Sequence, residues 1–413
     1  MGLIVQKFGG SSLADPQKIH RAASRAIRAK LRDNHVVVVV SAMGDTTDHL
    51  TDLAYRVTDR PSRREMDQLI ATGEQVSIAL MAMAIHHAGH DAISLTGGQI
   101  GLRTDRSFGR ARIRQITERR RLVSLLDQGS VVIVAGFQGI DESSNVTTLG
   151  RGGSDTTAVA LAASLGADLC EIFTDVEGIY SADPRIVPEA RKLDYICYDE
   201  MLELASLGAQ VMHSRSIELG KNYGVRMVVR SSFSEAKGTE IVQEPVDMDQ
   251  AIVRGAALKK SLARVEFAGV PNRPGIAGMI FTRVADRGVI VDDIIQVIHE
   301  GGTAADISFT IDAADIEAAR AAAQEITASL PEVAVRLKTG RAKVSVVGVG
   351  MRSHTGVASR MFEALHGAGV NIENICTSEI VVSCVVREED GEQALRAVHA
   401  ALALDQGSSE QRP

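Results

Sequence analysis

Two glycine-rich turns in this sequence contain the residue types that bind anions. The first, QKFGGSS (Gln6 to Ser12), follows an apolar strand and offers Lys7 beside Gly9 and Gly10. The glycines allow backbone amides to approach a ligand closely, and the lysine adds a compact positive charge for phosphate. A plain strand–turn–helix corner would contain the same glycines, so this stretch alone leaves a purely structural role open.

The second turn, TTLGRGGSDTT (Thr147 to Thr157), precedes an alanine-rich helical run. Arg151 lies between glycines, where its guanidinium could bind a carboxylate or phosphate through two parallel hydrogen bonds. A charged hydrogen bond contributes about 1.5–3 kcal/mol and a helix N-terminus about 0.3–1 kcal/mol, so the arginine would dominate anion binding. Ser154 or Asp155 is expected to cap the helix. A turn that only caps a helix would need neither the arginine nor all of the glycines.

Three further stretches carry polar residues where strands end or helices begin. SAMGDTTDHL (Ser41 to Leu50) follows the run VVVVV, and its hydroxyl groups suit helix capping as well as ligand binding. FTDVEGIYSADPR (Phe173 to Arg185) combines an acid, a base and an aromatic ring, which suits a nucleotide with its metal or a plain loop. Glu74 begins an otherwise apolar helix, where interaction with the helix dipole accounts for it as well as a ligand does.

These turns need a framework that brings them together. From residue 1 to residue 245, short apolar strands alternate with helical patterns, which indicates an α/β fold whose mainly parallel sheet is buried on both faces. Ligands bind at the carboxyl ends of strands in such sheets. Asp15 and Pro16 mark the start of the first helix. The predicted strands are Leu3–Val5, Val36–Val40, Val131–Ala135, Glu171–Thr174 and Val225–Val229.

The C-terminal part contains an internal repeat. Residues 275–294 (GIAGMIFTRVADRGVIVDDI) align without a gap with residues 356–375 (GVASRMFEALHGAGVNIENI). Each copy begins with a glycine, carries apolar residues at helical spacing and passes a second glycine into a strand-like stretch. Two copies are too few for a solenoid, so two similar α+β modules are predicted. The expected boundaries are a first domain at 1–245, modules at 251–330 and 331–405, and a disordered tail at 406–413.

Composition and missing motifs exclude several classes of protein. The 413 residues are 45% hydrophobic and 23% charged, which is ordinary for a globular protein, and the net charge of −7 argues against nucleic-acid binding. The longest apolar runs have strand length, and no secretory signal is recognisable, so a cytoplasmic protein without membrane contact is expected. The four cysteines form no C-x-x-C pair and are expected to be reduced core residues. The hydrolase motifs H-E-x-x-H and G-x-S-x-G are absent.

Taken together, the motifs resemble those of aspartate kinases of the amino acid kinase family. The match runs from QKFGGSS through SAMGDTTD, TGEQVSIAL, SLTGGQIG, GRGGSDTTAVALAA, TDVEGIYSADPR and DEMLELASLGAQVMH to SSF. The repeated modules resemble paired ACT domains. Each motif is short, but their order and combination are highly specific. The resemblance implies a three-layer αβα kinase domain with a mainly parallel sheet, followed by two ACT-like α+β (βαββαβ) domains.

The resemblance also implies an activity. ATP with Mg²⁺ would phosphorylate the side-chain carboxylate of L-aspartate to give 4-phospho-L-aspartate, toward lysine, threonine and methionine. A carboxyl group with a free pKa of about 3.9 is ionised at pH 7, so no general base is needed. Catalysis would instead depend on positioning two anions and neutralising their charge. No direct ligation of the metal by protein side chains is expected.

Roles for individual residues follow from the same resemblance. Lys7 and Asp155 are expected to be catalytic, with Asp155 orienting Lys7 and the substrate. Arg151 would bind the α-carboxylate of aspartate and Glu74 its α-ammonium group. The other expected aspartate contacts are Thr47, Gly152, Gly153 and Ser154. The expected nucleotide contacts are Lys7, Phe8, Gly9, Gly10, Ser41, Thr174, Asp175, Tyr180, Asp183 and Arg185.

The regulatory half departs from the family pattern in one place. The first module reads IVDDIIQV, with Ile290 and Val297 where the family commonly has asparagine. An amino-acid effector needs polar partners for its ammonium and carboxylate groups, so this change weakens the expectation that the first module binds lysine or threonine. A homo-oligomer through the ACT domains is expected, and an internal start such as Met248 would give a shorter subunit. The expected effector contacts are Asp292, Gln296, Asn371, Ser378 and Glu379.

Three alternative functions remain open on sequence grounds. Another amino acid kinase could act on glutamate, acetylglutamate or a nucleoside monophosphate, but the ACT-like repeat argues against it. A non-catalytic amino-acid sensor would not need the intact set of Lys7, Glu74, Arg151 and Asp155. A purely structural α/β protein would leave the chemistry clustered in the turns unexplained.

Overall fold

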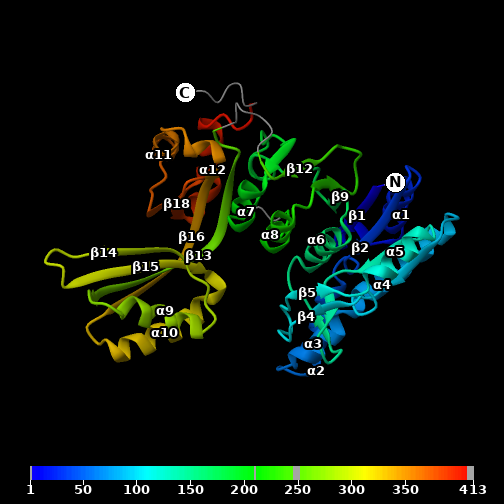
Figure 1. Ribbon diagram of the computed structural model, residues 1–413. Coiled ribbons are helices and arrows are strands. Elements are labelled where there is room, and N and C mark those ends of the chain that lie inside the picture. Colours follow the sequence, from blue (N-terminus) through cyan, green and yellow to red (C-terminus); the bar gives the residue numbers. More distant parts are fainter. Residues whose placement is uncertain (1, 209–210, 245–251, 407–413) are drawn as a thin grey trace. The chain divides into compact units, whose positions relative to one another are not determined.

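The computed structural model describes residues 2–208, 211–244 and 252–406, and these divide into two compact units (Figure 1). The first unit comprises residues 2–180 and 192–205 with residues 211–244. The second unit takes residues 181–191, 206–208 and 252–406. Met248 and the predicted tail, apart from Gln406, lie outside the described residues.

An eight-stranded sheet forms the centre of the first unit, in the order β10-β12-β11-β9-β1-β2-β6-β3. Every neighbouring pair is parallel except β11 with β12, which confirms the prediction of a mainly parallel sheet. Residues 36–40 of β2 are almost inaccessible to solvent, as expected for a strand covered on both faces. The strands of this sheet are β1 (Gly2–Phe8), β2 (Asn34–Val40), β3 (Ala92–Leu95), β6 (Val131–Ala135), β9 (Leu169–Thr174), β10 (Tyr195–Cys197), β11 (Met227–Ser231) and β12 (Thr239–Val242).

Helices cover both faces of this sheet, which confirms the three-layer arrangement. Helices α1 and α4 pack on one face and α5 and α6 on the other, while α8 packs against α6. The Asp15 side chain caps α1 as predicted by accepting a hydrogen bond from the Lys18 N–H at 2.9 Å. The helices of the first unit are α1 (Pro16–Lys30), α2 (Thr46–Val57), α3 (Arg63–Ile70), α4 (Thr72–His87), α5 (Arg119–Asp127), α6 (Gly153–Leu165), α7 (Tyr198–Ser206) and α8 (Ser214–Tyr223), with a 3-10 turn at Gly10–Leu13.

The helical stretch formed by α3 and α4 is long and apolar enough to span a membrane by length and composition alone. Half of its apolar window is buried inside the protein. Ile78, Met81 and Ile85 of α4 belong to the hydrophobic core beneath α1. This burial identifies α4 as a core helix of the first unit.

Local pattern located most of the central strands, with one shift. Four of the five predicted strands lie within β1, β2, β6 and β9, whereas the fifth, predicted at residues 225–229, is observed two residues later as β11. A second sheet of four short strands, in the order β5-β4-β7-β8, was not predicted. Its strands are β4 (Leu102–Thr104), β5 (Ile113–Ile116), β7 (Gln138–Ile140) and β8 (Val146–Thr148).

The second unit is built on a six-stranded antiparallel sheet in the order β14-β15-β13-β16-β18-β17. Its two sequence repeats adopt matching structures. Gly275 and Gly356 precede α9 and α11 with the same φ of 92°, and Gly288 and Gly369 follow them with φ of 74° and 71°. The elements are β13 (Gly255–Pro271), α9 (Ile276–Asp286), β14 (Asp292–Ile298), β15 (Ala304–Asp312), α10 (Ile316–Ser329), β16 (Ala334–Val347), α11 (Val357–Gly367), β17 (Asn374–Thr377), β18 (Val381–Arg387) and α12 (Gly391–Ala401), with 3-10 turns at Ala313–Asp315, Val349–Arg352 and Glu388–Asp390.

Two long strands, β13 and β16, run through both modules. Residues 262–268 of β13 pair with 334–341 of β16 in the first module, whereas residues 255–259 pair with 343–347 in the second. The second module therefore takes a strand from residues that precede the first module in the chain. This interleaving differs from the predicted linear division at residue 331, because an apolar strand pattern does not reveal which neighbour each half of a strand will have.

The first unit also differs from the predicted span of 1–245. Residues 181–191 leave it and join the second unit, where Ala182 and Val187 contribute to the hydrophobic core under α11 and α12.

The cysteine prediction holds for Cys170, Cys197 and Cys384, which are free and buried, but Cys376 is exposed.

Candidate active site

The turns after β1 and β2 pack directly against each other at the carboxyl end of the main sheet. The Gly44 N–H donates to the Gly10 carbonyl at 3.1 Å. A Cβ atom at Gly10 would lie 2.8 Å from the Ala42 carbonyl oxygen, so a larger residue would force these turns apart. The absence of a side chain at this glycine is therefore what lets the predicted turns QKFGGSS and SAMGDTTDHL meet.

Lys7 and Asp155 join this edge of the sheet to helix α6. The Lys7 Nζ atom lies 2.6 Å from Asp155 Oδ1, and the two side chains are only 11% and 10% exposed. Lys7 comes from β1 next to its end, and Asp155 from the first turn of α6, where an acid is favoured by the helix dipole. A Cβ atom at Gly9 would approach the Lys7 ammonium to 3.4 Å, so the glycine leaves room around the charge.

The start of α6 differs from the predicted cap. The helix begins at Gly153, and its N-cap is Gly152 in the left-handed conformation with φ of 66°, without any side-chain capping bond. Ser154 and Asp155 are already helical and buried, so the prediction that one of them caps the helix was wrong. A Cβ atom at Gly152 would lie 2.2 Å from the Cβ of His213, which shows how closely α8 approaches this turn.

Glu74 is a buried carboxyl group in the first turn of α4 and only 3% exposed. Its Oε1 accepts a hydrogen bond from the Ala42 N–H at 3.0 Å, which links α4 to the turn after β2. Its Oε2 is buried and has no hydrogen-bond partner among the described residues. Burial raises the pKa of Glu74 to about 7. An uncompensated buried carboxylate of this kind is able to bind a cationic group.

Arg151 is exposed, and its side chain forms no ion pair or hydrogen bond within the described parts of the chain. Ser154 lies against Gly136, where a Cβ atom would be only 2.7 Å from the Ser154 Oγ. Thr47 is half-buried in the first turn of α2, close to the turn after β2. The structure thus leaves the arginine available to a ligand, at the base of a helix whose first turn holds Asp155.

The expected nucleotide residues of the first unit lie along neighbouring strand ends. Thr174 ends β9 and donates a hydrogen bond to the exposed Asp175 at 3.1 Å. Ser41 follows β2, and its N–H donates to the Phe8 carbonyl at 3.1 Å. The Phe8 ring is fully buried and stacks on Phe173 with centroids 4.7 Å apart, so only the Phe8 backbone is available to a ligand.

Three further expected nucleotide residues are split between the units. Tyr180 is half-buried at the end of the first segment of the first unit and forms an isolated bridge with Lys192. Burial, together with the charge of Glu177, raises the pKa of Tyr180. Asp183 and Arg185 lie in the second unit and pair with each other at 2.7 Å. Hydrogen bonds from the Arg185 side chain lower the pKa of Asp183.

Two of the expected effector contacts are already engaged in ion pairs. Asp292 lies 2.5 Å from the Lys343 Nζ atom, and Asp293 lies 3.0 Å from the same atom, which ties the start of β14 to the second module. Glu379 pairs with Arg352 at 3.2 Å. The remaining expected contacts, Gln296, Asn371 and Ser378, are exposed on β14 and around β17.

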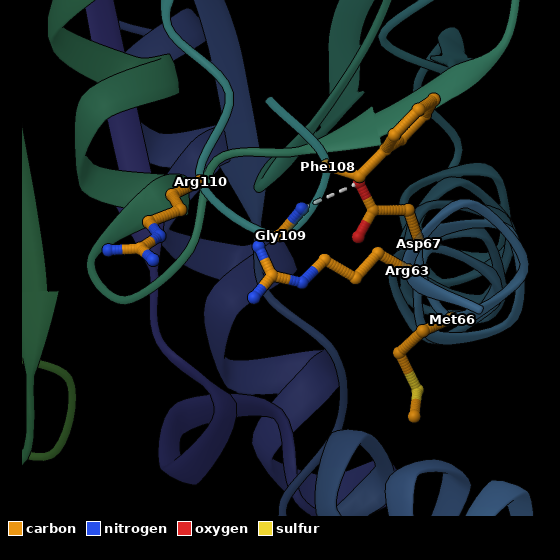
Figure 2. A pocket seen from close by; sticks show the side chains of 6 residues that line it. All are labelled: Arg63, Met66, Asp67, Phe108, Gly109 and Arg110. Carbon is orange, nitrogen blue, oxygen red and sulfur yellow. Dashed lines mark hydrogen bonds between the residues drawn. The ribbon is translucent and has the colours of Figure 1, made fainter. Parts of the chain in front are cut away.

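Sequence reasoning missed Asp67 and Arg215, which organise the loops beside Arg151. Asp67 of α3 is 1% exposed and accepts hydrogen bonds from Gly109 and Thr148, and it lines a pocket of about 210 Å³ (Figure 2). Arg215 of α8 donates to the carbonyls of Leu149 and Ala111. Both residues belong to mainly polar helices, where a charged side chain is common and gives no sign that it will be buried.

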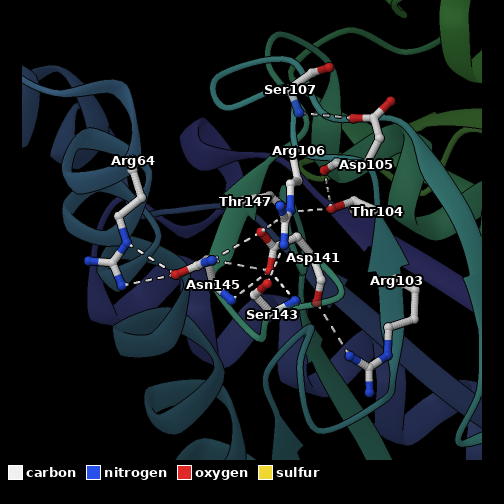
Figure 3. Close-up of polar contacts among 10 residues, drawn as sticks. All are labelled: Arg64, Arg103, Thr104, Asp105, Arg106, Ser107, Asp141, Ser143, Asn145 and Thr147. Atoms are coloured by element: carbon white, nitrogen blue, oxygen red, sulfur yellow. Dashed lines mark hydrogen bonds and ion pairs between the residues drawn. The ribbon is translucent and has the colours of Figure 1, made fainter.

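The second sheet is itself held by a polar network (Figure 3). Asp141 Oδ1 accepts hydrogen bonds from the backbone N–H groups of Ser143 and Asn145 at 2.9 and 2.8 Å, which closes the turn between β7 and β8. Thr104 and Thr147 bond through their hydroxyl groups at 2.6 Å and join β4 to β8. Since β8 leads directly into residues 149–155, this network fixes the approach to Arg151.

A metal site formed by protein side chains needs several acidic, histidine or cysteine groups close together. Across residues 2–208, 211–244 and 252–406, no group of three His, Cys, Asp or Glu side chains is arranged to hold a metal ion. At the carboxyl edge of the sheet, Asp155 pairs with Lys7, Glu74 accepts from the Ala42 N–H and Asp175 accepts from the Thr174 hydroxyl.

Comparison with known proteins places this geometry in a family. The sequence model of the amino acid kinase family matches residues 2–231, and ACT domain models match residues 263–328 and 344–402. Aspartokinase from Bacillus sp. (strain MGA3) is 49% identical over 405 residues, which is 98% of each chain. Aspartokinase 2 from Bacillus subtilis (strain 168) is 48% identical over 409 residues, which is 99% of this chain and 100% of that one. The structure of E. coli aspartokinase III in complex with aspartate and ADP has a TM-score of 0.83 at 25% identity, covering 97% of this chain and 100% of that one.

Similarity of this extent covers both units rather than the kinase part alone. The first unit supplies a parallel sheet with a buried lysine–aspartate pair and a buried glutamate, and the second supplies two interleaved α+β modules. The predicted fold class and family are confirmed. The chain belongs to the aspartokinases, kinases of the amino acid kinase family that carry two ACT domains.

Proposed function

We propose that this chain transfers the γ-phosphoryl group of ATP to the side-chain carboxylate of L-aspartate, forming 4-phospho-L-aspartate and ADP. The observation that carries this proposal is the Lys7–Asp155 ion pair at the carboxyl end of the central strands, where α/β proteins bind their ligands. The relatives named aspartokinase support the choice of acceptor. The product would lead toward lysine, threonine and methionine in the cytoplasm.

Lys7 serves in this proposal to neutralise the negative charge that the acceptor carboxylate and the triphosphate bring together. An ammonium group has three N–H donors, so a lysine that donates one to Asp155 keeps two for phosphate oxygens. Asp155 holds the lysine side chain in place before the substrates bind, which reduces the reorganisation needed during the reaction. The acceptor is already a carboxylate at neutral pH, so the pair has no proton to remove.

Recognition of aspartate is assigned to Glu74 and Arg151. The free Oε2 of Glu74 would accept hydrogen bonds from the α-ammonium group, which compensates the charge that burial disfavours. Arg151, which has no protein partner in the described chain, would bind the α-carboxylate through two N–H groups. The side-chain carboxylate is then left for the phosphoryl group. Thr47, Gly152, Gly153 and Ser154 complete the proposed aspartate site.

The nucleotide is assigned to the neighbouring strand ends. Gly9 and Gly10 would present backbone amides to the phosphates, together with Lys7. Mg²⁺ would enter with the nucleotide, bound mainly by phosphate oxygens and water, and would supply further charge neutralisation. The other proposed nucleotide contacts in the first unit are the Phe8 backbone, Ser41, Thr174, Asp175 and Tyr180. Asp183 and Arg185 belong to the second unit, and their nucleotide role stays a prediction from the sequence.

The second unit is proposed to regulate the kinase by binding an amino acid and to join chains into a homo-oligomer. The E. coli aspartokinase III structure in complex with lysine and aspartate supports lysine as one candidate effector, beside threonine.

The edge strand β14 exposes Ile294 and Val297 by 54% and 57%, and an unpaired apolar edge is a surface that a second chain would cover. Ile294→Lys should lower the molar mass measured by light scattering, whereas Leu31→Lys on the first unit should not. An unchanged mass for Ile294→Lys would exclude β14 from the interface.

The acceptor is tested by trapping the product. An acyl phosphate reacts with hydroxylamine to give a coloured hydroxamate, so the protein is incubated with ATP, Mg²⁺, hydroxylamine and one acceptor at a time. Aspartate should give hydroxamate, while glutamate, which differs by one methylene group, serves as the matched control. Hydroxamate with glutamate but not with aspartate would refute the substrate, and no product with any acceptor would favour the sensor alternative. Repeating the assay with lysine, threonine or both identifies the effector.

A further inference from the structure

We propose that Asp67 and Arg215 are positioning residues that hold the Arg151 loop in its substrate-binding position. These two side chains, called the loop clasp below, come from helices α3 and α8. They form hydrogen bonds with two segments, residues 109–111 and 148–149. The inference rests on the proposed role of Arg151 in binding aspartate. It adds two residues that lie outside the turn motifs.

Asp67 accepts hydrogen bonds from N–H groups of both segments. Its Oδ2 accepts the N–H of Gly109 at 3.0 Å and the N–H of Thr148 at 2.8 Å. Its Oδ1 accepts the Thr148 hydroxyl at 2.8 Å. The carboxyl group is almost fully buried, and burial raises its pKa against the opposing effect of these three hydrogen bonds. Burying this carboxyl group is costly unless Gly109 and Thr148 stay in place to donate these hydrogen bonds.

Arg215 donates hydrogen bonds to carbonyl groups of the same two segments. Its two terminal nitrogens donate to the Leu149 carbonyl at 2.7 Å and to the Ala111 carbonyl at 2.6 Å. Burial lowers the pKa of the guanidinium, and the nearby Arg112 lowers it further. Leu149 precedes Arg151 by two residues, so the Arg215 bond acts on the backbone directly before the substrate-binding arginine.

The two segments also contact each other between the two clasp residues. The Ala111 N–H donates to the Thr148 carbonyl at 2.8 Å. A Cβ atom at Gly150 would lie 2.9 Å from the Gly109 carbonyl oxygen, so the backbones touch at a glycine with φ of 77°. His213 of the same α8 terminus closes against Gly152. Arg151 therefore extends from a loop whose preceding and following backbone is immobilised by α8.

This arrangement suits positioning better than general stabilisation. The clasp residues bond to Gly109, Ala111 and Leu149 in loops and to Thr148 at the end of β8, rather than to other helices or to the strands of the main sheet. The pocket in Figure 2 is lined by Asp67 and by Gly109 and Arg110 of the first clasped segment, so that segment borders a space open to ligands. A displacement of about 1 Å in a binding group is enough to reduce catalysis on the order of a hundredfold.

The test measures both Michaelis constants for the full chain with three substitutions. Arg215→Met removes both hydrogen bonds, and Arg215→Lys keeps the charge with one possible carbonyl contact. Arg226→Met is the matched control, because Arg226 precedes β11 at the amino end of the sheet and pairs with Glu240 at the surface. Arg215→Met should raise the KM for aspartate about tenfold or more and leave the KM for ATP within about twofold. Arg215→Lys should be intermediate, and Arg226→Met should match the wild type.

A double-mutant comparison separates positioning from stability. If Arg215 acts through Arg151, adding Arg215→Met to Arg151→Ala should raise the aspartate KM by less than about twofold, because the effect has already been lost. Equal increases in both Michaelis constants, or independent effects in the double variant, would overturn the clasp while leaving the proposed reaction intact. If Arg215→Met fails to fold, the Arg215→Lys variant gives the same comparison. Failure of the wild type to form hydroxamate with aspartate would instead reject the proposed function itself.

Discussion

The Lys7 ammonium nitrogen lies 2.6 Å from Asp155 Oδ1 in a nearly buried ion pair. The pair joins the central strand β1 to the first turn of α6, so one contact fixes the Lys7 charge, which is proposed to bind phosphate, against the helix that follows Arg151. Removing one partner of such a pair leaves the other charge buried without compensation. Substitutions here are therefore expected to affect both stability and activity, and the two effects need separate measurements.

Lys7→Met should abolish most of the catalytic rate. Loss of one preorganised charge at the reacting group reduces kcat on the order of 10²–10³-fold. The rate is measured as ADP release with saturating aspartate and ATP, and thermal unfolding reports the stability of the variant. Lys30→Met, at the end of α1, is the control for loss of a lysine and should keep its kcat. A normal kcat with only a raised KM for ATP would assign Lys7 to ground-state binding alone.

Arg151→Ala should weaken aspartate binding selectively. Losing a charged hydrogen bond of about 1.5–3 kcal/mol corresponds to about a 10- to 150-fold increase in the KM for aspartate. The KM for ATP should change by less than about twofold, because the arginine is assigned to the acceptor. Steady-state kinetics with each substrate varied in turn give both constants, and Arg32→Ala on the same unit is the control. A larger effect on ATP than on aspartate would refute the placement of Arg151.

Glu74→Gln should remove a pH dependence of folding stability. The folded-state pKa of about 7 lies above the ordinary value of 4.5, so the folded protein keeps a proton that the unfolded chain has released. The free energy of unfolding of the wild type should therefore fall as pH rises from 4.5 to 7, by about 3 kcal/mol in total from this group. Glutamine keeps the acceptor for the Ala42 N–H without the charge, so the variant should be more stable than the wild type above pH 7.

Urea unfolding at pH 5 and pH 8 measures this difference. Glu65→Gln, an exposed glutamate on the neighbouring helix α3, is the control and should follow the wild type at both pH values. If the free energy of unfolding changes between pH 5 and pH 8 by the same amount in Glu74→Gln and in the wild type, the Glu74 charge is already balanced by other groups in the folded state. The same variant should also bind aspartate more weakly, since it can no longer attract the α-ammonium group electrostatically.

Gly152→Ala should destabilise the protein more than Gly166→Ala. Both glycines flank α6 in the left-handed conformation, with φ of 66° and 67°, so each substitution incurs the same backbone cost of about 1–2 kcal/mol. A Cβ atom at Gly152 also meets His213 at 2.2 Å, whereas nothing lies within 4 Å at Gly166. The difference in the free energy of unfolding between the two variants measures the packing of α8 against the turn. Equal destabilisation would mean that His213 moves away without cost.

Local patterns in the sequence were sufficient for most of the secondary structure of the first unit. The run of five β-branched valines from Val36 to Val40 is typical of a strand covered on both faces, and Asp15 followed by Pro16 is a strong local signal for a helix start. The predicted cap of α6, Ser154 or Asp155, was wrong. A helix can begin after a left-handed glycine or after a serine or aspartate cap, and this turn contains both kinds of residue within a few positions. Gly152, which caps the helix, lies against His213, and this contact between distant segments is encoded in no local pattern.

By itself, the sequence determined the family and the order of its motifs, because these depend only on residue types and spacing. It also determined which side chains could bind anions, among them Lys7 and Arg151. Only the tertiary structure decided that Glu74 is buried with a free oxygen, that Asp67 and Arg215 hold the Arg151 loop, and that residues 255–259 complete the second ACT module. These features arise from contacts between segments far apart in the chain, and burial and strand pairing are properties of the assembled fold rather than of any local segment.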